Sequence, residues 1–261
     1  MPTGRTAVAI GADLVFAAGG DGTVQGCAQA LAGTRIPLAI IPLGTANLTA
    51  RALGIPHRPG RAIETGFRGR DHRIDLARAE DLARAGDTVF TAMAGIGLDA
   101  TVVRATRPRS KRRLGWFSYA ATGLARLSAP RARFTIRMDG GEPLVRTARS
   151  VVVGNVGLLP GGFPLLPGAC LDDGLLDVGI LAPSNPADWA IVAAQVISRD
   201  TRQHRRLERY QARRVEIGSD AELPRQADGE VLAPGRTLSV SVWPAALTVR
   251  LPVRTSRCCG R

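Results

Sequence analysis

Apolar and polar positions in the first seventy residues follow the pattern of alternating strands and helices. Residues 12–18 form a mostly apolar run that predicts a first β-strand, and residues 36–41 predict a second, buried strand. Between them, apolar residues recur at helical spacing, at Val24, Cys27, Ala28 and Leu31. A short helix after the second strand should end at Leu53, because Gly54 and then Pro56 follow. This order of elements predicts an open α/β unit.

From about residue 70 the pattern changes to short strands in which apolar and polar residues alternate. Phe134 and Ile136, for example, stand between polar neighbours, and an Asp-Gly turn follows shortly after them. Further predicted strands cover residues 88–93, 151–153, 175–181, 215–217, 238–242 and 247–251. Helices interrupt the series at about residues 115–127 and 186–197. The pattern is typical of a β-sandwich.

The predicted organisation therefore has three parts. Residues 1–70 form the α/β domain, and residues 71–245 form the β-sandwich domain. Residues 246–261 are a C-terminal strand and tail, and the sequence leaves open whether that strand returns to the first domain. A chain of 261 residues is long enough for this arrangement, and a hydrophobic fraction of 45% is sufficient for a buried core.

The chain is strongly basic, with 35 Lys and Arg against 22 Asp and Glu and a net charge of +13. This excess indicates either a coding preference for arginine or attraction to an anionic partner such as membrane lipid, nucleotide or nucleic acid. An aromatic content of 4% argues against a stacking surface for single-stranded nucleic acid, so no nucleic-acid partner is expected. The scattered cysteines do not have zinc-site spacing and favour a reducing, cytoplasmic setting.

A glycine-rich turn joins the first predicted strand to the helix behind it. Its residues are Gly19, Gly20, Asp21, Gly22 and Thr23. The glycines allow positive φ and a close approach of the backbone, and the helix N-terminus offers unpaired N–H groups to a phosphate. A carboxylate at this place is unfavourable for bare phosphate but suitable if Mg²⁺ lies between them. The alternative is a tight strand-to-helix turn that binds no ligand.

A second loop, with the sequence Pro-Leu-Gly-Thr-Ala-Asn, follows the second strand. Thr45 and Asn47 are compact polar residues beyond the C-terminal end of a strand, where open α/β sheets bind their ligands. Asn47 is equally explained as the cap of the helix that comes next.

Together the two loops resemble those of the diacylglycerol kinase-like lipid kinases, which include bacterial diacylglycerol kinases and sphingosine kinases. The first loop is also similar to those of NAD kinases and phosphofructokinases, but the second is not. The resemblance implies that ATP and Mg²⁺ bind at the loops. It implies that the nucleotide contacts are Gly19, Gly20, Asp21, Gly22, Thr23, Val24, Gln25, Thr45 and Asn47.

Asp172, Asp173 and Asp177 surround an Asp-Gly turn. Carboxylates with backbone carbonyls are suitable ligands for a hard cation, whereas the plain alternative is a turn between two strands. The stretch resembles the structural Mg²⁺ site of bacterial diacylglycerol kinases. That resemblance implies ligation by Asp173 and by the backbone carbonyls of Cys170 and Leu175.

Asp228, Gly229 and Glu230 form a further candidate site. Taken alone they are an Asp-Gly hairpin turn. In the family that the chain resembles, an Asp-Gly-Glu at this place faces the interdomain cleft and holds the catalytic base. If the three residues lie on one strand, both carboxylates face the same side, and Asp228 is slightly favoured as the base. Residues 95–100 resemble another segment that lines this cleft.

Residues 104–113 are rich in basic side chains and precede Trp116, Phe117 and Tyr119. Such a run is either a solvated loop or a contact with an anionic membrane surface, and residues 199–214 present the same two alternatives. No apolar stretch reaches the ~18 residues of a membrane span, so a contact with lipid would be peripheral.

These observations predict a shortened open α/β nucleotide domain followed by a β-sandwich domain, with the active site in the cleft between them. The expected function is ATP-dependent phosphorylation of a lipid hydroxyl, with diacylglycerol as substrate and phosphatidic acid as product, at the inner face of the membrane. Whether the chain forms a homodimer is left open. One alternative is an inactive binding remnant, because the family's opening strand and its Asn-Pro-x-Ser-Gly loop are missing before Met1. The other alternative is an NAD kinase-like enzyme.

Overall fold

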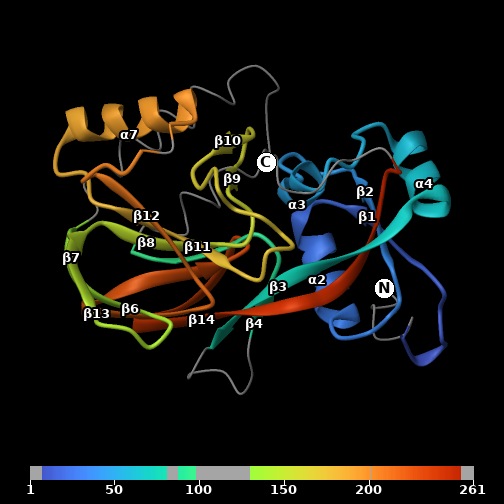
Figure 1. The fold of residues 1–261 in the computed structure, drawn as a ribbon, viewed down its shortest axis with the longest axis horizontal. Coiled ribbons are helices and arrows are strands. Elements are labelled where there is room, and N and C mark those ends of the chain that lie inside the picture. Colours follow the sequence, from blue (N-terminus) through green and yellow to red (C-terminus); the bar gives the residue numbers. More distant parts are fainter. Residues whose placement is uncertain (1–7, 81–87, 98–129, 201, 254–261) are drawn as a thin grey trace.

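The computed structural model describes residues 8–80, 88–97, 130–200 and 202–253 (Figure 1). The basic run at 104–113, the predicted helix at 115–127, Asp99, and the tail from residue 255 lie outside the described residues.

The first part of the chain is a small α/β unit. Its elements are β1 (Val15–Gly19), α2 (Asp21–Leu31), β2 (Leu38–Pro42), α3 (Leu48–Ala52) and α4 (Pro59–Arg68). Strands β1 and β2 are parallel, with Val15 opposite Leu38 and Gly19 opposite Pro42. The right-hand side of Figure 1 shows this unit at one end of the molecule. Helix α4 was not predicted, although Pro59 at its first turn and Gly69 at its C-cap are start and stop signals.

The rest of the described chain is almost entirely β-structure. Its first strands are β3 (Arg70–Glu80), β4 (Thr88–Phe90), β5 (Met93–Ile96), β6 (Ala132–Met138), β7 (Leu144–Ala148) and β8 (Ser150–Gly154). After the short β9 (Leu158–Leu159) and β10 (Phe163–Pro164), the chain continues with β11 (Leu176–Leu181), α7 (Pro186–Ser198), β12 (Leu207–Ala212), β13 (Arg214–Ala227) and β14 (Glu230–Leu251). The predicted strand at 88–93 is therefore two strands, β4 and β5, separated by Thr91 and Ala92.

A single sheet runs through both parts of the molecule, with the strand order β1-β2-β14-β13-β5-β8-β11-β12. Its continuity depends on β14, a strand of 22 residues whose end lies parallel to β2, with Val249 opposite Leu38. Strand β3 lies antiparallel to β14 along nearly its whole length. The C-terminal strand thus pairs with the first unit, and two long strands connect that unit to the sandwich.

Two main hydrophobic cores form on this sheet. One fills the sandwich and includes the fully buried Phe90, Phe134 and Ile136. The other lies between the α/β unit and the ends of β3 and β14, and includes Leu38 and Val249. The fold class predicted from the sequence, an α/β unit joined to a β-sandwich, is confirmed.

Candidate active site

The first glycine loop is the junction between β1 and α2. Gly20 is the N-cap of α2, and its carbonyl accepts hydrogen bonds from the N–H groups of Thr23 and Val24 at 3.0 and 3.1 Å. In the described part of the chain, no side chain caps this helix, so the N–H groups of Asp21 and Gly22 stay available at its positive end. This arrangement is suited to binding a phosphate group.

The glycines of the loop are required for close approach and not for positive φ. None of Gly19, Gly20 and Gly22 adopts positive φ, contrary to that part of the expectation. A Cβ on Gly19 would lie 2.3 Å from Thr23 Oγ1, and one on Gly44 would lie 2.5 Å from Gly20 Cα. The backbones of the first and second loops are therefore in direct contact, and a larger residue would force them apart.

Two side chains form hydrogen bonds with the backbone of the second loop and of the helix that follows it. Asn47, with a φ of 48°, accepts a hydrogen bond from Gly44 N at 3.0 Å and donates one to Gly44 O at 2.7 Å. Asp21 Oδ1 accepts a hydrogen bond from Leu48 N at 2.6 Å. It thereby gives a partner to a backbone N–H group in the first turn of α3, which has none within the helix. One Asp21 oxygen thus caps this helix, and the other is available to a cation. The capping contact joins residues 27 positions apart and was not predicted.

Asp228 lies at the start of the tight hairpin that joins β13 to β14. Its Oδ2 accepts hydrogen bonds from Thr91 N and Thr91 Oγ1 at 2.7 and 2.9 Å. Its Oδ1 accepts from Ala92 N and Met93 N at 2.8 and 2.9 Å. Burial raises the pKa of this carboxyl above its ordinary value, and the hydrogen bonds from Thr91, Met93 and Ala92 oppose that rise. The carboxylate is fully engaged in holding the segment between β4 and β5.

Glu230 is separated from Asp228 by the turn itself. Asp228 and Gly229 have φ values of 47° and 79°, and Ala227 pairs with Glu230 across the two-residue loop. The hairpin turn that the Asp-Gly pair predicts when taken alone is therefore present. The alternative, in which both carboxylates share one face of a strand, is wrong, because Asp228 is in the turn and only Glu230 is on β14. Glu230 is exposed at the first position of that strand.

A buried polar chain connects this hairpin to the second loop. Thr49, at the start of α3, donates from Oγ1 to Thr91 Oγ1 at 3.1 Å, and Thr91 Oγ1 donates in turn to Asp228. Both threonines are 1% exposed. Three residues from the α/β unit, the β4–β5 segment and the β13–β14 hairpin thus form one continuous network, although they are far apart in the sequence.

The turn at Asp173 is anchored to β3. Asp75, which is 3% exposed, accepts hydrogen bonds from Gly174 N and Ala245 N, both at 2.7 Å. Asp173 Oδ1 accepts from Leu175 N at 3.0 Å, and His72 Nε2 lies 2.8 Å from Asp172 Oδ2. Asn155 Nδ2 donates to Asp75 O at 2.8 Å and lies 3.5 Å from Thr91 O. Asn155 therefore connects Asp75 to Thr91.

The chemistry of the Asp173 turn is compatible with Mg²⁺. Burial raises the pKa of Asp177 to about 6; a hydrogen bond from Gln211 opposes the rise, and the negative charge of Asp173 adds to it. A cation would relieve this repulsion between carboxylates. Within the described ranges, no three His, Cys, Asp or Glu side chains gather into a metal-binding group, so the carbonyls of Cys170 and Leu175 would have to complete the site.

Four residues that hold these segments together were not predicted from the sequence: Thr49, Thr91, Asp75 and Asn155. Each is a buried polar residue, and Asn155, at 1% exposure, directly follows the apolar strand β8. A polar side chain at the end of a buried strand was the available signal.

Comparison with known families agrees with both halves of this description. The family model "Diacylglycerol kinase catalytic domain" matches residues 3–79, and the model "YegS C-terminal NAD kinase beta sandwich-like domain" matches residues 92–251. The first match contains the two glycine loops, and the second contains the Asp173 turn and the Asp228 hairpin.

Relatives and solved structures agree with these matches. "Probable lipid kinase YegS-like" of Pseudomonas fluorescens is 35% identical over 253 residues, which cover 95% of this chain and 80% of that protein. The protein of the same name from Klebsiella pneumoniae is 33% identical over 255 residues, which cover 94% of this chain and 80% of that protein. The structure titled "Crystal structure of a putative diacylglycerol kinase from Bacillus anthracis str. Sterne" has a TM-score of 0.74 and 26% identity, over 92% of this chain and 76% of that one. The chain therefore belongs to the diacylglycerol kinase-like family of lipid kinases.

Proposed function

We propose that this lipid kinase transfers the γ-phosphoryl group of ATP to the free hydroxyl of diacylglycerol, giving phosphatidic acid. The observation that carries the proposal is the polar chain Thr49–Thr91–Asp228, which fixes the β13–β14 hairpin to the helix behind the second glycine loop. Phosphoryl transfer depends on holding the phosphate-binding loops and the acceptor side in a fixed relation. The relatives named as lipid kinases support a lipid acceptor.

The nucleotide phosphates would bind where the two loops meet. The N–H groups at the start of α2 face this place, and Gly22 has open space around it. Asp21 would hold Mg²⁺ through the carboxylate oxygen that does not bind Leu48. When bound, this ion supplies positive charge that neutralises the phosphates during transfer.

The contacts favour Glu230 over Asp228 as the base that accepts the proton of the lipid hydroxyl. Both oxygens of Asp228 already accept two hydrogen bonds each from the Thr91–Met93 segment, which leaves little capacity for a further proton donor. Glu230 directly follows this turn and is an exposed residue at the first position of β14. Asp228 would hold the hairpin, and Glu230 would perform the proton transfer.

A membrane lipid as substrate implies contact with an anionic membrane surface. A net charge of +13 supports attraction to such a surface. None of the described helices is long and apolar enough to cross a membrane. We infer peripheral attachment at the cytoplasmic face, with a contribution from the basic run at 104–113.

The test is transfer of ³²P from ATP to a panel of acceptors presented in mixed micelles with Mg²⁺. The panel contains diacylglycerol, monoacylglycerol, sphingosine, phosphatidylglycerol and NAD. Label should appear in diacylglycerol with the highest kcat/KM. Preferential labelling of another lipid would overturn the proposed substrate, and labelling of NAD alone would overturn the lipid assignment.

Two variants address the base directly. Glu230→Gln should lower kcat by about 10²–10⁴-fold, the usual contribution of a positioned base, and leave ATP affinity nearly unchanged. The matched control is Glu142→Gln, which removes the same charge from an exposed loop between β6 and β7. Normal turnover in Glu230→Gln would show that the base lies elsewhere.

A further inference from the structure

A cavity of about 850 Å³ lies far from the glycine loops. It is lined by residues of β7, β12, the first turn of α7 and the loops before and after α7, together with Arg131 next to β6. Strands β1 and β12 stand at opposite ends of the strand order, and Figure 1 places them at opposite ends of the molecule. The cavity is therefore separate from the candidate nucleotide site.

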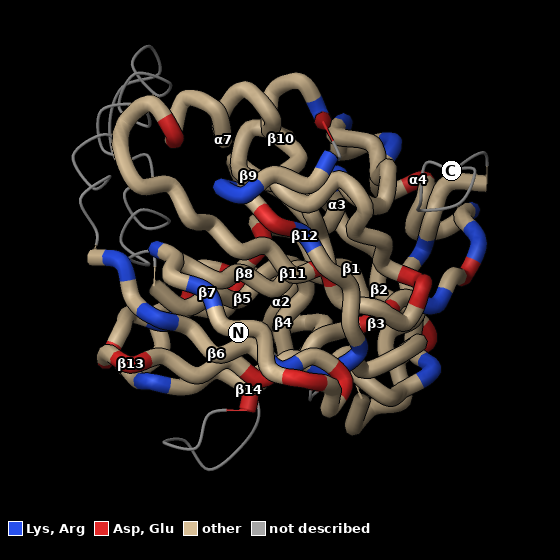
Figure 2. Tube along the Cα trace, turned by 60° about the vertical axis from the view of Figure 1, so that its left-hand side comes forward, with Lys and Arg blue, Asp and Glu red and all other residues tan. Residues whose placement is uncertain are grey.

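The charges around this cavity are unbalanced. Four arginines line it, and two carboxylates accompany them, which leaves two positive charges in excess. Figure 2 shows basic segments in blue beside β7 and β6. The arginines are Arg131, Arg146, Arg205 and Arg206, and the carboxylates are Asp188 and Glu208.

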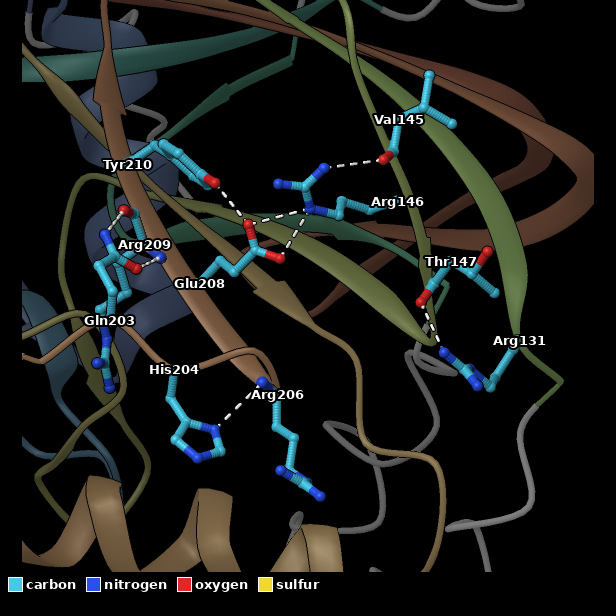
Figure 3. Close-up of polar contacts among 10 residues, drawn as sticks. All are labelled: Arg131, Val145, Arg146, Thr147, Gln203, His204, Arg206, Glu208, Arg209 and Tyr210. Atoms are coloured by element: carbon cyan, nitrogen blue, oxygen red, sulfur yellow. Dashed lines mark hydrogen bonds and ion pairs between the residues drawn. The ribbon is translucent and has the colours of Figure 1, made fainter.

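Both carboxylates are already engaged with arginines. Arg146 Nε donates to the two oxygens of Glu208 at 2.8 and 3.1 Å, and the Tyr210 hydroxyl also donates to Glu208 (Figure 3). Asp188 pairs with Arg206 and accepts a hydrogen bond from Ser184 N at 2.9 Å. These carboxylates fix two guanidinium groups in place and are not available as ligands for a cation.

Several donors at the cavity remain available. Arg205 has no partner among the described residues, and Arg131 uses only Nη2, which donates to Thr147 O at 3.0 Å. His204 Nδ1 accepts from Arg206 N at 3.3 Å, which assigns the ring proton of the neutral imidazole to Nε2 (Figure 3). Guanidinium forks and an imidazole N–H, beside carboxylates that are already paired with arginines, are the donor set that phosphate oxygens require.

We propose that this cavity is a second ligand site, which binds a phosphate monoester dianion. Two excess positive charges match the charge of this group, and the guanidinium groups can contact its oxygens in pairs. The phosphate can belong to a lipid headgroup at a membrane or to a small soluble molecule, since both present the same oxygens. The site does not depend on the kinase reaction, because its residues come from the opposite end of the sheet.

The test is calorimetric titration of the full chain with sn-glycerol 3-phosphate, in the presence of a non-hydrolysable ATP analogue that occupies the glycine loops. Arg131→Gln combined with Arg205→Gln removes the two exposed cations of the cavity and leaves both ion pairs in place. Binding should weaken by about tenfold for each arginine that contacts the phosphate. The matched control is Arg137→Gln with Arg213→Gln, which removes two exposed arginines that do not line the cavity.

Unchanged binding in the cavity variant, or equal weakening in the control, would overturn the proposal. A melting temperature that matches the unaltered protein verifies that the cavity variant is folded. Competition by phosphatidylcholine vesicles that contain phosphatidate would identify a lipid headgroup as the source of the phosphate. No competition at equal headgroup concentration would identify a soluble phosphate monoester.

Discussion

The carboxylate of Asp21 accepts a hydrogen bond of 2.6 Å from the backbone N–H of Leu48, so a residue of the first glycine loop caps the helix behind the second. The two loops are consequently one structural unit. Because Gly20 and Gly44 are also in contact, movement of either loop must displace the other.

Asp21 has two roles that a pair of substitutions can separate. Asp21→Asn keeps a side-chain oxygen to accept from Leu48 but removes the charge that would hold Mg²⁺, so kcat should fall by about 100-fold or more while the melting temperature stays nearly unchanged. Asp21→Ala removes both functions and should also cost about 1 kcal/mol of stability. Steady-state kinetics at saturating Mg²⁺ and ATP, with thermal melts, would measure both. Unaltered turnover in Asp21→Asn would refute the metal role.

Gly44 tests the contact between the loops. In Gly44→Ala the new Cβ would lie 2.5 Å from Gly20 Cα and 2.8 Å from Asn47 Oδ1, so the loops must separate. The substitution should cost about 1–3 kcal/mol in urea denaturation and raise the KM for ATP. Gly26→Ala, inside α2 with open space around it, is the control and should stabilise the protein by about 0.5–1 kcal/mol. If both substitutions behave alike, the loops are not held by this contact.

Local patterns in the sequence were sufficient for the elements around the loops. The spacing of Val24, Ala28 and Leu31 predicts α2, and those three residues are its buried face. The apolar run at 36–41 overlaps β2, whose residues are all buried. Hydrophobic period and glycine turns are properties of neighbouring residues, so the sequence shows them directly.

The contacts that organise the candidate site could not be predicted in this way. Thr91 and Asp228 are 137 positions apart and meet only because β13 pairs with β5 in the folded sheet. Pairing between distant strands depends on the whole topology and not on a local period. The Asp-Gly pair at 228–229 did indicate the hairpin turn that the positive φ values and the pairing of Ala227 with Glu230 show. The segment that the Asp228 carboxylate holds could not be read from this local pattern.

Asp228 should be important mainly for stability. Asp228→Asn replaces one carboxylate oxygen by an NH₂ group, which must face either the N–H of Thr91 or those of Ala92 and Met93, and each donor left buried without a partner costs about 1–3 kcal/mol. We expect a loss of about 1–3 kcal/mol for each N–H left unpaired, measured by urea denaturation. Asp220→Asn is the control, because Asp220 is an exposed carboxylate of the same strand that accepts from one backbone N–H, that of Arg133. A fully stable Asp228→Asn with strongly reduced kcat would instead favour Asp228 as the base.

The proposed Mg²⁺ site at the Asp173 turn predicts that thermal stability depends on Mg²⁺. If Mg²⁺ binds Asp173 together with the carbonyls of Cys170 and Leu175, the ion stabilises the folded state in proportion to its occupancy, because the unfolded chain does not form the site. The unaltered protein should melt at a higher temperature in Mg²⁺ than in EDTA. Asp173→Ala should abolish this difference and lower the melting temperature more in Mg²⁺ than in EDTA, whereas Asp13→Ala, at an exposed position outside the turn, should keep the difference. The plain-turn alternative gives a different result, because the hydrogen bond from Leu175 N to Asp173 Oδ1 is then lost in both buffers and the melting temperature falls equally in each.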